Sequence, residues 1–236
     1  MNPFGGPVVL ADEVSSGISK TSPHRDMDLV HHALAALDVN APGILRCYRP
    51  QPTAAFAPRD MIADYHARAA KAVADAGFAP VERLAGGHLA VYDGNAVVID
   101  LVSPHAKPRE HIQKRFRLFA GAIASALKKL SIDARIGALP GEYCPGAYSV
   151  NGGGLVKLVG NAQRINKNGY HLGAVLSVTP SNQAKAAIAA AYAIMGIEFD
   201  PATFGAITEL KPGLSFDCLC KAIQHSITAL VDVKLP

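Results

Sequence analysis

The sequence lacks the features that mark membrane-spanning, exported and nucleic-acid-binding chains. No uninterrupted apolar stretch is long enough to cross a bilayer, and the N-terminal residues show no basic segment followed by an apolar one. The 23 Lys and Arg residues outnumber the 19 Asp and Glu residues, giving a net charge of +4, but they are scattered rather than gathered in a run. We therefore expect a cytoplasmic protein whose partner is neither a membrane nor a nucleic acid.

The four cysteines are too few and too irregularly spaced to act as a group. Cys47, Cys144, Cys218 and Cys220 show neither the spacing of metal ligands nor that of a disulfide framework. Reduced thiols and no metal site are the simplest interpretation. What the sequence does have is a large apolar fraction, since 50% of its 236 residues are hydrophobic. That is enough for one sizeable core.

The apolar pattern predicts short strands mixed with helices, without the regular alternation that builds a parallel sheet. Asp93-Gly94-Asn95 is typical of a hairpin turn, Asp60 of a helix N-cap, and residues 160–169 of a turn between two strands. We expect strands at residues 7–10, 43–49, 89–92, 96–102, 155–159 and 170–178, and helices at residues 27–37, 60–76, 108–130, 182–195 and 216–230. The sequence thus predicts an α+β fold with a mixed, mainly antiparallel sheet flanked by helices.

One lysine stands where a charge is hard to place. Lys157 lies between Leu155-Val156 and Leu158-Val159, with glycines on both sides. An ammonium in apolar surroundings is costly without a partner, so we expect Lys157 to meet an anion that the glycines allow the backbone to approach. The alternative is a lysine on an edge strand that reaches water.

Two motifs resemble those of the lipoate–protein ligase and octanoyltransferase family, which is related to the biotin protein ligases. The pattern Lys-apolar-x-Gly-x-Ala-Gln, starting at Lys157, resembles the family's core motif. Arg83-Leu84-Ala85-Gly86-Gly87-His88 is similar to the family's Arg-x-(Ser/Thr)-Gly-Gly-Gly loop, with His88 in place of the third glycine. The resemblance covers most of residues 45–178, and no close match to the Gly-Arg-Gly-Arg-type loop of biotin ligases is present.

The resemblance implies a fold like the biotin/lipoate ligase catalytic domain. Residues 26–180 would form this domain, after an extended N-terminal arm at residues 1–25. A helical C-terminal segment would follow at residues 181–236, either packed on this domain or as a small subdomain.

The resemblance also implies which residues contact the substrate. They are Lys157 as a catalytic residue, with Arg83, Gly86, Gly87, His88, Gly160, Asn161, Gln163, Arg164 and His171 as substrate-binding residues. Two glycines leave a slot for a thin acyl chain, and Arg83 can hold its polar end. The alternatives are a solvated arginine in a turn for Arg83, an ordinary turn residue for His88, and a hydrogen-bonded core histidine for His171.

Cys144 lies in a Pro- and Gly-containing turn before Lys157, and its role decides between two possible reactions. Octanoyltransferases of the family that form an acyl-enzyme carry a nucleophilic cysteine at a comparable place, whereas a packed, inert thiol is the alternative. The match around Lys157 favours a ligase that attaches lipoyl or octanoyl groups to a lysine of an acceptor lipoyl-domain protein, using lipoate or octanoate, ATP and Mg²⁺ through acyl-AMP. The first alternative is an ATP-independent octanoyltransferase that uses Cys144, takes the acyl group from an acyl carrier protein and needs no cofactor. The second alternative is a non-catalytic acyl-binding relative.

Overall fold

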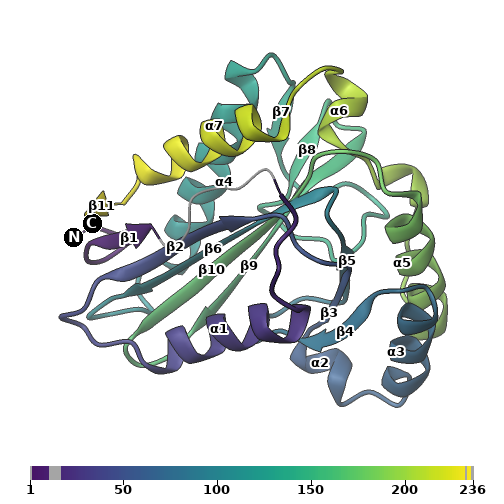
Figure 1. The fold of residues 1–236 in the computed structure, drawn as a ribbon, viewed down its shortest axis with the longest axis horizontal. Coiled ribbons are helices and arrows are strands. Elements are labelled where there is room, and N and C mark those ends of the chain that lie inside the picture. The colour runs from purple at the N-terminus through teal and green to yellow at the C-terminus, as the bar shows by residue number, and fades with distance from the viewer. Residues whose placement is uncertain (1, 11–16, 232, 235–236) are drawn as a thin grey trace.

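An eight-stranded mixed sheet forms the centre of the protein (Figure 1). The computed structural model describes residues 2–10, 17–231 and 233–234. In order across the sheet, the strands are β11 (Val233–Lys234), β1 (Val8–Leu10), β2 (Gly43–Tyr48), β6 (Ala96–Pro104), β10 (Gly169–Ser177), β9 (Val156–Ile165), β8 (Val150–Gly152) and β7 (Ala134–Ile136). β1 runs parallel to β2 and β11, and the other neighbours are antiparallel. The predicted α+β class with a mainly antiparallel sheet is confirmed.

A second sheet of three strands lies beside the first. β3 (Thr53–Phe56) stands between β4 (Ala79–Glu82), which is parallel to it, and β5 (Ala90–Tyr92), which is antiparallel. The predicted hairpin of residues 89–102 is therefore wrong, because β5 and β6 belong to different sheets. The turn between them carries the chain from one sheet to the other. Asp93 holds it by accepting hydrogen bonds from the Asn95 amide and the Ser181 hydroxyl.

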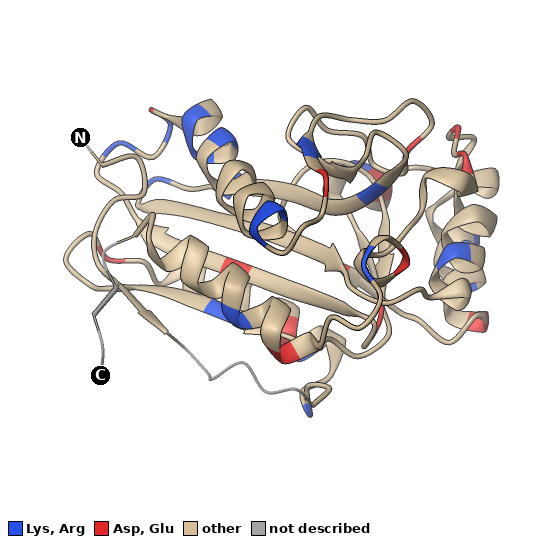
Figure 2. Cartoon of the chain, turned by 90° about the horizontal axis from the view of Figure 1, so that it is seen from above, with Lys and Arg blue, Asp and Glu red and all other residues tan. Residues whose placement is uncertain are grey.

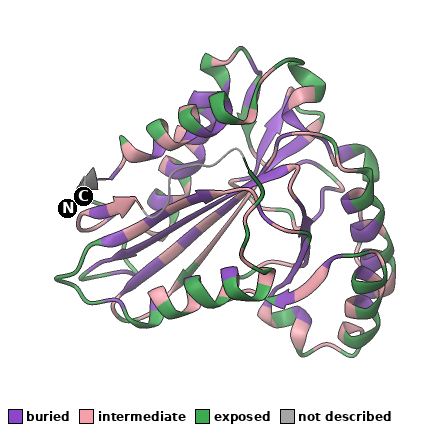
Figure 3. Ribbon diagram, in the orientation of Figure 1, coloured by how far each residue is buried: buried purple, intermediate pink, exposed green. Residues whose placement is uncertain are grey.

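The helices cover the large sheet on both faces. They are α1 (Pro23–Ala35), α2 (Pro58–Met61), α3 (His66–Asp75), α4 (Ile112–Lys129), α5 (Asn182–Met195), α6 (Ile207–Leu210) and α7 (Phe216–Thr228), with a 3₁₀ turn at Pro201–Thr203. α4 and α7 pack on each other and on one face, whereas α1 and the small sheet cover the other. Figure 3 shows the buried residues concentrated in the strands and on the inner faces of these helices.

β6 lies at the centre of both cores, which explains its continuous apolar sequence. Val97, Ile99 and Leu101 belong to the core under α4 and α7, while Val98 and Val102 face α1 and the small sheet. Asp100 lies between Val98 and Val102 on this second face and is buried. A carboxylate in the middle of a buried strand is unusual, because burying a charge is costly unless it is paired.

Several predicted boundaries differ from the structure. The helix predicted at residues 27–37 is α1, which begins at Pro23 behind the Ser22 N-cap. Asp60 is not an N-cap: it lies inside α2, where its carboxylate accepts from the Ala57 amide, and a separate helix begins at His66. The helix predicted from residue 108 begins at Ile112, behind His111 in a left-handed conformation. The turn predicted at residues 160–169 is mostly strand, because β9 continues to Ile165 in register with β10.

The division into an N-terminal arm, a catalytic domain and a C-terminal segment stays a prediction. The helices after residue 181 pack on two different places, α5 against α3 and α7 against α4. Within the described residues, no helix combines the length and apolar character needed to cross a membrane. Figure 2 shows Lys and Arg residues spread over several elements instead of forming one patch.

Candidate active site

Cys144 lies in the loop between β7 and β8 with a left-handed backbone. Its φ of 41° is a conformation that non-glycine residues rarely adopt, at a cost of about 1–3 kcal/mol. Two contacts hold the residue there. Its amide donates to the Tyr192 hydroxyl of α5 at 2.9 Å, and its carbonyl accepts from Lys157 Nζ at 3.0 Å. The surrounding structure therefore fixes the direction of the thiol.

Hydrogen-bond donors surround the sulfur of Cys144. The amide of His88 donates to Sγ at 3.2 Å, and Arg83 Nη2 lies 3.6 Å from Sγ while also donating to the His88 carbonyl at 2.7 Å. Gly87, with φ of 105°, lets the loop approach: a Cβ there would stand 2.7 Å from Sγ. A Cβ at Gly86 would meet no described atom within 4 Å. Two N–H groups thus contact this sulfur.

Lys157 is 1% exposed, and all three of its ammonium protons have acceptors. Nζ donates to Glu142 Oε1 at 3.0 Å, to the Tyr143 carbonyl at 2.8 Å and to the Cys144 carbonyl at 3.0 Å. Burial lowers the pKa of Lys157, and the Glu142 carboxylate opposes that shift. The anion expected for this lysine is therefore a residue of its own chain, and the lysine holds the backbone of the Cys144 loop.

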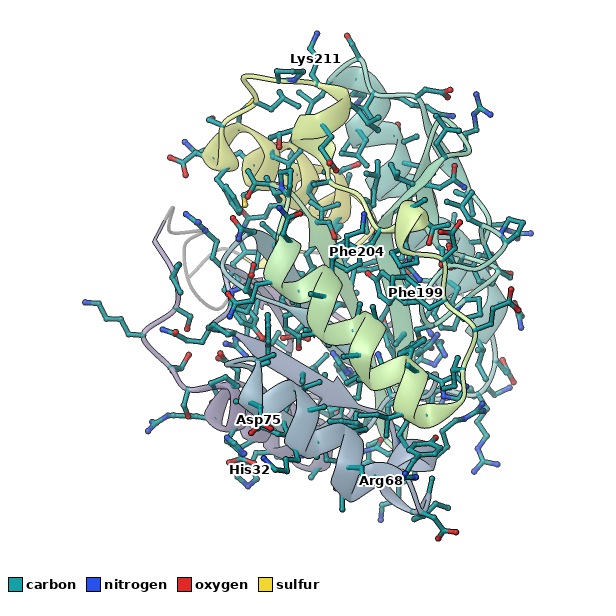
Figure 4. The ribbon with its side chains drawn as sticks, turned by 90° about the vertical axis from the view of Figure 1, so that its right-hand side faces the viewer. His32, Arg68, Asp75, Phe199, Phe204 and Lys211 are labelled. Carbon is teal, nitrogen blue, oxygen red and sulfur yellow. The ribbon has the colours of Figure 1, made fainter. Side chains whose placement is uncertain are left out.

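Glu142, which the sequence analysis did not single out, is the centre of this loop. Its carboxylate accepts from the amides of Leu139 and Gly146 and from the Ser149 hydroxyl, in addition to Lys157. Tyr143, next in the chain, places its ring 4.4 Å from Lys157 Nζ and packs against Phe199 and Phe204. These two phenylalanines lie on the segment that follows α5 (Figure 4).

His88 is oriented by a fully buried carboxylate. His88 Nδ1 lies 2.9 Å from Asp60 Oδ1, and Asp60 also accepts from the Tyr65 hydroxyl and the Ala57 amide. His88 Nε2 lies 3.4 Å from Arg59 Nη1 at the protein surface. Through His88, Asp60 therefore anchors the loop whose His88 amide contacts Cys144. The sequence analysis missed this role because it took Asp60 for a helix N-cap.

An apolar pocket leads away from Arg83, between α1, the small sheet and the large sheet. Gly160, near the Lys157 side chain, and His171 of β10 are among the residues that line it. Much of the remaining lining is apolar, from Val30, Ala55, Leu84, Ala90, Val98 and Val175. The structure thus brings Arg83, Gly87, His88, Cys144, Lys157 and Gly160 together, and of these Arg83 and Gly160 line the pocket, as does His171.

The other predicted residues of β9 lie outside this pocket. Asn161 donates to the Tyr148 carbonyl at 2.7 Å, and Gln163 accepts from Arg115 Nε of α4 at 2.8 Å. Arg164 is exposed. Their assignment as substrate-binding residues stays a prediction, although they lie on a strand, which turns alternate side chains to opposite faces, and not in the expected turn.

Of the two cations that could hold a nucleotide phosphate, Lys157 is fully engaged and Arg83 is engaged in part, since its buried Nε has no hydrogen-bond partner among the described residues. The protons of Lys157 are all donated, and Arg83 Nη2 contacts the His88 carbonyl and Cys144 Sγ. The slot beside Gly87 is filled by Sγ and the Arg83 guanidinium. No cluster of three His, Cys, Asp or Glu side chains suited to a metal ion occurs in the part of the chain that the structure describes. The ammonium of Lys157 therefore needs no ligand phosphate as a partner.

Comparison with known proteins identifies the family. Residues 22–227 match the model of the lipoyl protein ligase A/B catalytic domain, and the chain belongs to this family. It is 27% identical over 143 residues to an octanoyl-GcvH:protein N-octanoyltransferase of Geobacillus kaustophilus, covering 61% of this chain and 50% of that protein. An enzyme of the same name from Oceanobacillus iheyensis is 27% identical over 169 residues, or 66% of this chain and 60% of that one. The matches thus span only about half of these relatives' length.

Solved structures of lipoate ligases share the fold. A lipoate-protein ligase A bound with ATP superimposes with a TM-score of 0.70 at 17% identity, covering 98% of this chain and 87% of that one. A bipartite lipoate protein ligase from Thermoplasma acidophilum gives a TM-score of 0.69 at 17% identity, with 99% and 86% covered. At this identity the likeness establishes the fold alone.

Proposed function

We propose that the protein is an acyltransferase that moves an octanoyl or lipoyl group from a carrier protein, through Cys144, to a lysine of an acceptor lipoyl-domain protein. The observation that carries this proposal is the Cys144 sulfur, which lies in a strained loop with the His88 amide and the Arg83 guanidinium beside it. The names of the curated relatives support the same reaction and indicate octanoylated GcvH as a donor. An acyl carrier protein is the other donor to test.

In the first step, Cys144 Sγ attacks the acyl carbonyl carbon of the donor. A carbon–sulfur bond forms and the carbonyl oxygen takes the negative charge, close to the N–H groups of His88 and Arg83. Collapse of this intermediate breaks the bond to the carrier. The carrier's thiol or amine leaves with the proton that Cys144 gave up, and Cys144 retains the acyl group as a thioester.

In the second step, the neutral amine of the acceptor lysine attacks this thioester. The oxyanion forms in the same place, and its collapse expels Cys144 Sγ, which recovers a proton from the attacking amine. An amide is formed, the thiol is restored, and no nucleotide is consumed. The role of Lys157 is to position Cys144, since its contacts are to the backbone of that loop and to Glu142.

This proposal reverses the order in which the sequence ranks the two chemistries. The sequence ranks the ligase first on the match around Lys157, but all three ammonium protons of that lysine have acceptors within the chain. An acyl-binding protein without turnover would have no use for a strained cysteine surrounded by donors. Because an acylated thiol must begin reduced, we also propose a cytoplasmic location.

The test is acyl labelling followed by intact-mass spectrometry. The protein is incubated with the octanoyl thioester of an acyl carrier protein or with an octanoylated GcvH-type lipoyl domain, and then with an apo lipoyl domain. We expect one octanoyl adduct on the protein and its transfer to the acceptor, both lost in Cys144→Ser. Cys218→Ser is the matched control, because Cys218 is an exposed thiol on α7. Undiminished acceptor modification by Cys144→Ser with octanoate and ATP, with pyrophosphate released, would establish the ligase instead.

A further inference from the structure

One part of the pocket lining, its inner end, is polar. Asp100 of β6, His171 of β10 and His31 of α1 all line it. Asp100 is 4% exposed, and its Oδ1 lies 2.9 Å from His171 Nε2. A Cβ at Gly173 would stand 3.1 Å from the His171 ring, so this glycine leaves the ring its place over the sheet. Three polar side chains thus converge where an aliphatic chain would bring only methylene groups.

Two atoms of this group are left without hydrogen bonds. Asp100 Oδ2 and His31 Nε2 are buried and have no hydrogen-bond partner among the described residues. Arg46 Nη1, which is itself buried without a hydrogen-bond partner, lies 3.8 Å from Asp100 Oδ2, an ion-pair distance rather than a hydrogen bond. Burial lowers the pKa of His31, so its imidazole is neutral near pH 7 and Nε2 can donate or accept. A buried donor or acceptor that stays unpaired is destabilising.

The sheet register sets the distance from the reactive end of the pocket. Gly160 on β9 is opposite Val175 on β10, whereas Asp100 is two strands across from Ala162, through Gly173. Two residues along a strand and two strands across correspond to about 12 Å between the Cα atoms of Gly160 and Asp100. A medium-length acyl chain that enters the pocket beside Gly160 can therefore bring its far end near Asp100, which lines the pocket together with His31.

We propose that this inner end is a binding subsite for a hydroxyl group, so that the pocket takes a medium-length acyl chain with a hydroxyl near its far end in preference to a plain alkyl chain. The hydroxyl donates to Asp100 Oδ2 and its oxygen accepts from His31 Nε2. A plain methyl end would leave both polar groups buried without a partner. The free energy of binding is then less favourable, because a site built to hydrogen-bond its ligand strongly disfavours an analogue without the hydroxyl. The inference rests on the proposed function only in taking the pocket to be the acyl site.

The test measures binding without reaction, so that it does not depend on acyl transfer. Octanamide, 8-hydroxyoctanamide and lipoamide are titrated into the wild-type protein by calorimetry. We expect 8-hydroxyoctanamide to bind about tenfold or more tightly than octanamide. Lipoamide, whose disulfide ring has no donor, should gain nothing over octanamide.

Matched variants identify the residues responsible. His31→Leu and Asp100→Asn should each bring the two affinities within about twofold of each other, whereas His32→Leu, at an exposed neighbour on α1 labelled in Figure 4, should keep the wild-type ratio. Asp100→Asn retains the shape of the side chain, and His31→Leu serves if that variant does not fold. Equal wild-type affinities, which indicate that water alone fills the subsite, would overturn the proposal. So would failure of every amide to bind, or a preference that neither variant changes. Failure of acyl transfer alongside selective binding would refute the proposed function and leave this subsite standing.

Discussion

A single methyl group added at Gly87 should slow acylation of Cys144 while the protein still folds. In Gly87→Ala, the new Cβ would stand 2.7 Å from Cys144 Sγ and 2.8 Å from Arg83 Nη2. Side-chain carbons do not approach other atoms so closely, so the sulfur and the guanidinium must move apart or the loop must shift. The φ of 105° adds backbone strain of about 1–3 kcal/mol. The substitution therefore acts on the contacts that the His88 amide and the Arg83 guanidinium make with the sulfur.

We expect acylation of Cys144 in Gly87→Ala to fall about a hundredfold, a loss comparable with removing one preorganised donor from an oxyanion site. Gly86→Ala is the matched control, because a Cβ there meets no described atom within 4 Å. The assay is the rate of octanoyl adduct formation by intact mass, with thermal unfolding measured in parallel. A folded Gly87→Ala that is acylated at the wild-type rate would refute the assignment of this sulfur environment to catalysis. Equal impairment of Gly86→Ala would show that the loop as a whole is merely sensitive to substitution.

The remaining predictions concern the buried charges. Lys157→Met should leave the Glu142 carboxylate buried without its cation and destabilise the protein by about 3 kcal/mol or more. Adding Glu142→Gln should recover stability in urea unfolding but not acylation, and a fully active double variant would contradict the positioning role of Lys157. Because the pKa of His31 is lowered from 6.5, the unfolded state binds more protons than the folded state just below that pH, so stability falls as the pH drops through this window. His31→Leu should make this loss shallower in melts between about pH 7 and pH 5, whereas an unchanged slope would contradict the burial of a neutral imidazole.

Elements with strong local end signals could be predicted from the sequence almost to the residue. α5 begins and ends where predicted, because the Ser181 hydroxyl accepts from the Ala184 amide and Gly196 takes the left-handed conformation that stops the helix. β2 follows its alternating pattern and ends before Pro50. In these segments the residues that set the boundary lie within one turn of it.

Local sequence signals could not predict which strands pair with each other in the sheets. Asp93-Gly94-Asn95 does form a turn, yet the strands on either side join different sheets. What holds this turn is the Ser181 hydroxyl, far along the chain. A turn motif reports that the chain changes direction, and it carries no information about which strands will later pair.

The candidate site was predicted in part, through its motifs. The motifs single out Lys157, Arg83 and Cys144, which the structure brings together. Two supporting residues, Glu142 and Tyr192, escaped the sequence analysis. Glu142 had a usable signal, since a buried lysine requires an anion and this carboxylate lies two residues before Cys144. Tyr192 had none, because an aromatic residue on the inner face of a helix is usually only part of the core.

The position of Lys157 changes what a buried cation contributes to this site. The physical requirement for an anion was correct, but Glu142 fulfils it within the chain, so a ligand need not enter to satisfy the lysine. The ion pair instead ties β9 to the carbonyls of Tyr143 and Cys144, while Tyr192 of α5 takes the Cys144 amide. The left-handed backbone of the cysteine is thus held from the sheet on one side and from a helix on the other. This network therefore fixes the direction of one thiol, and the proposed transfer of an acyl group between two protein partners requires a carrier held in this way.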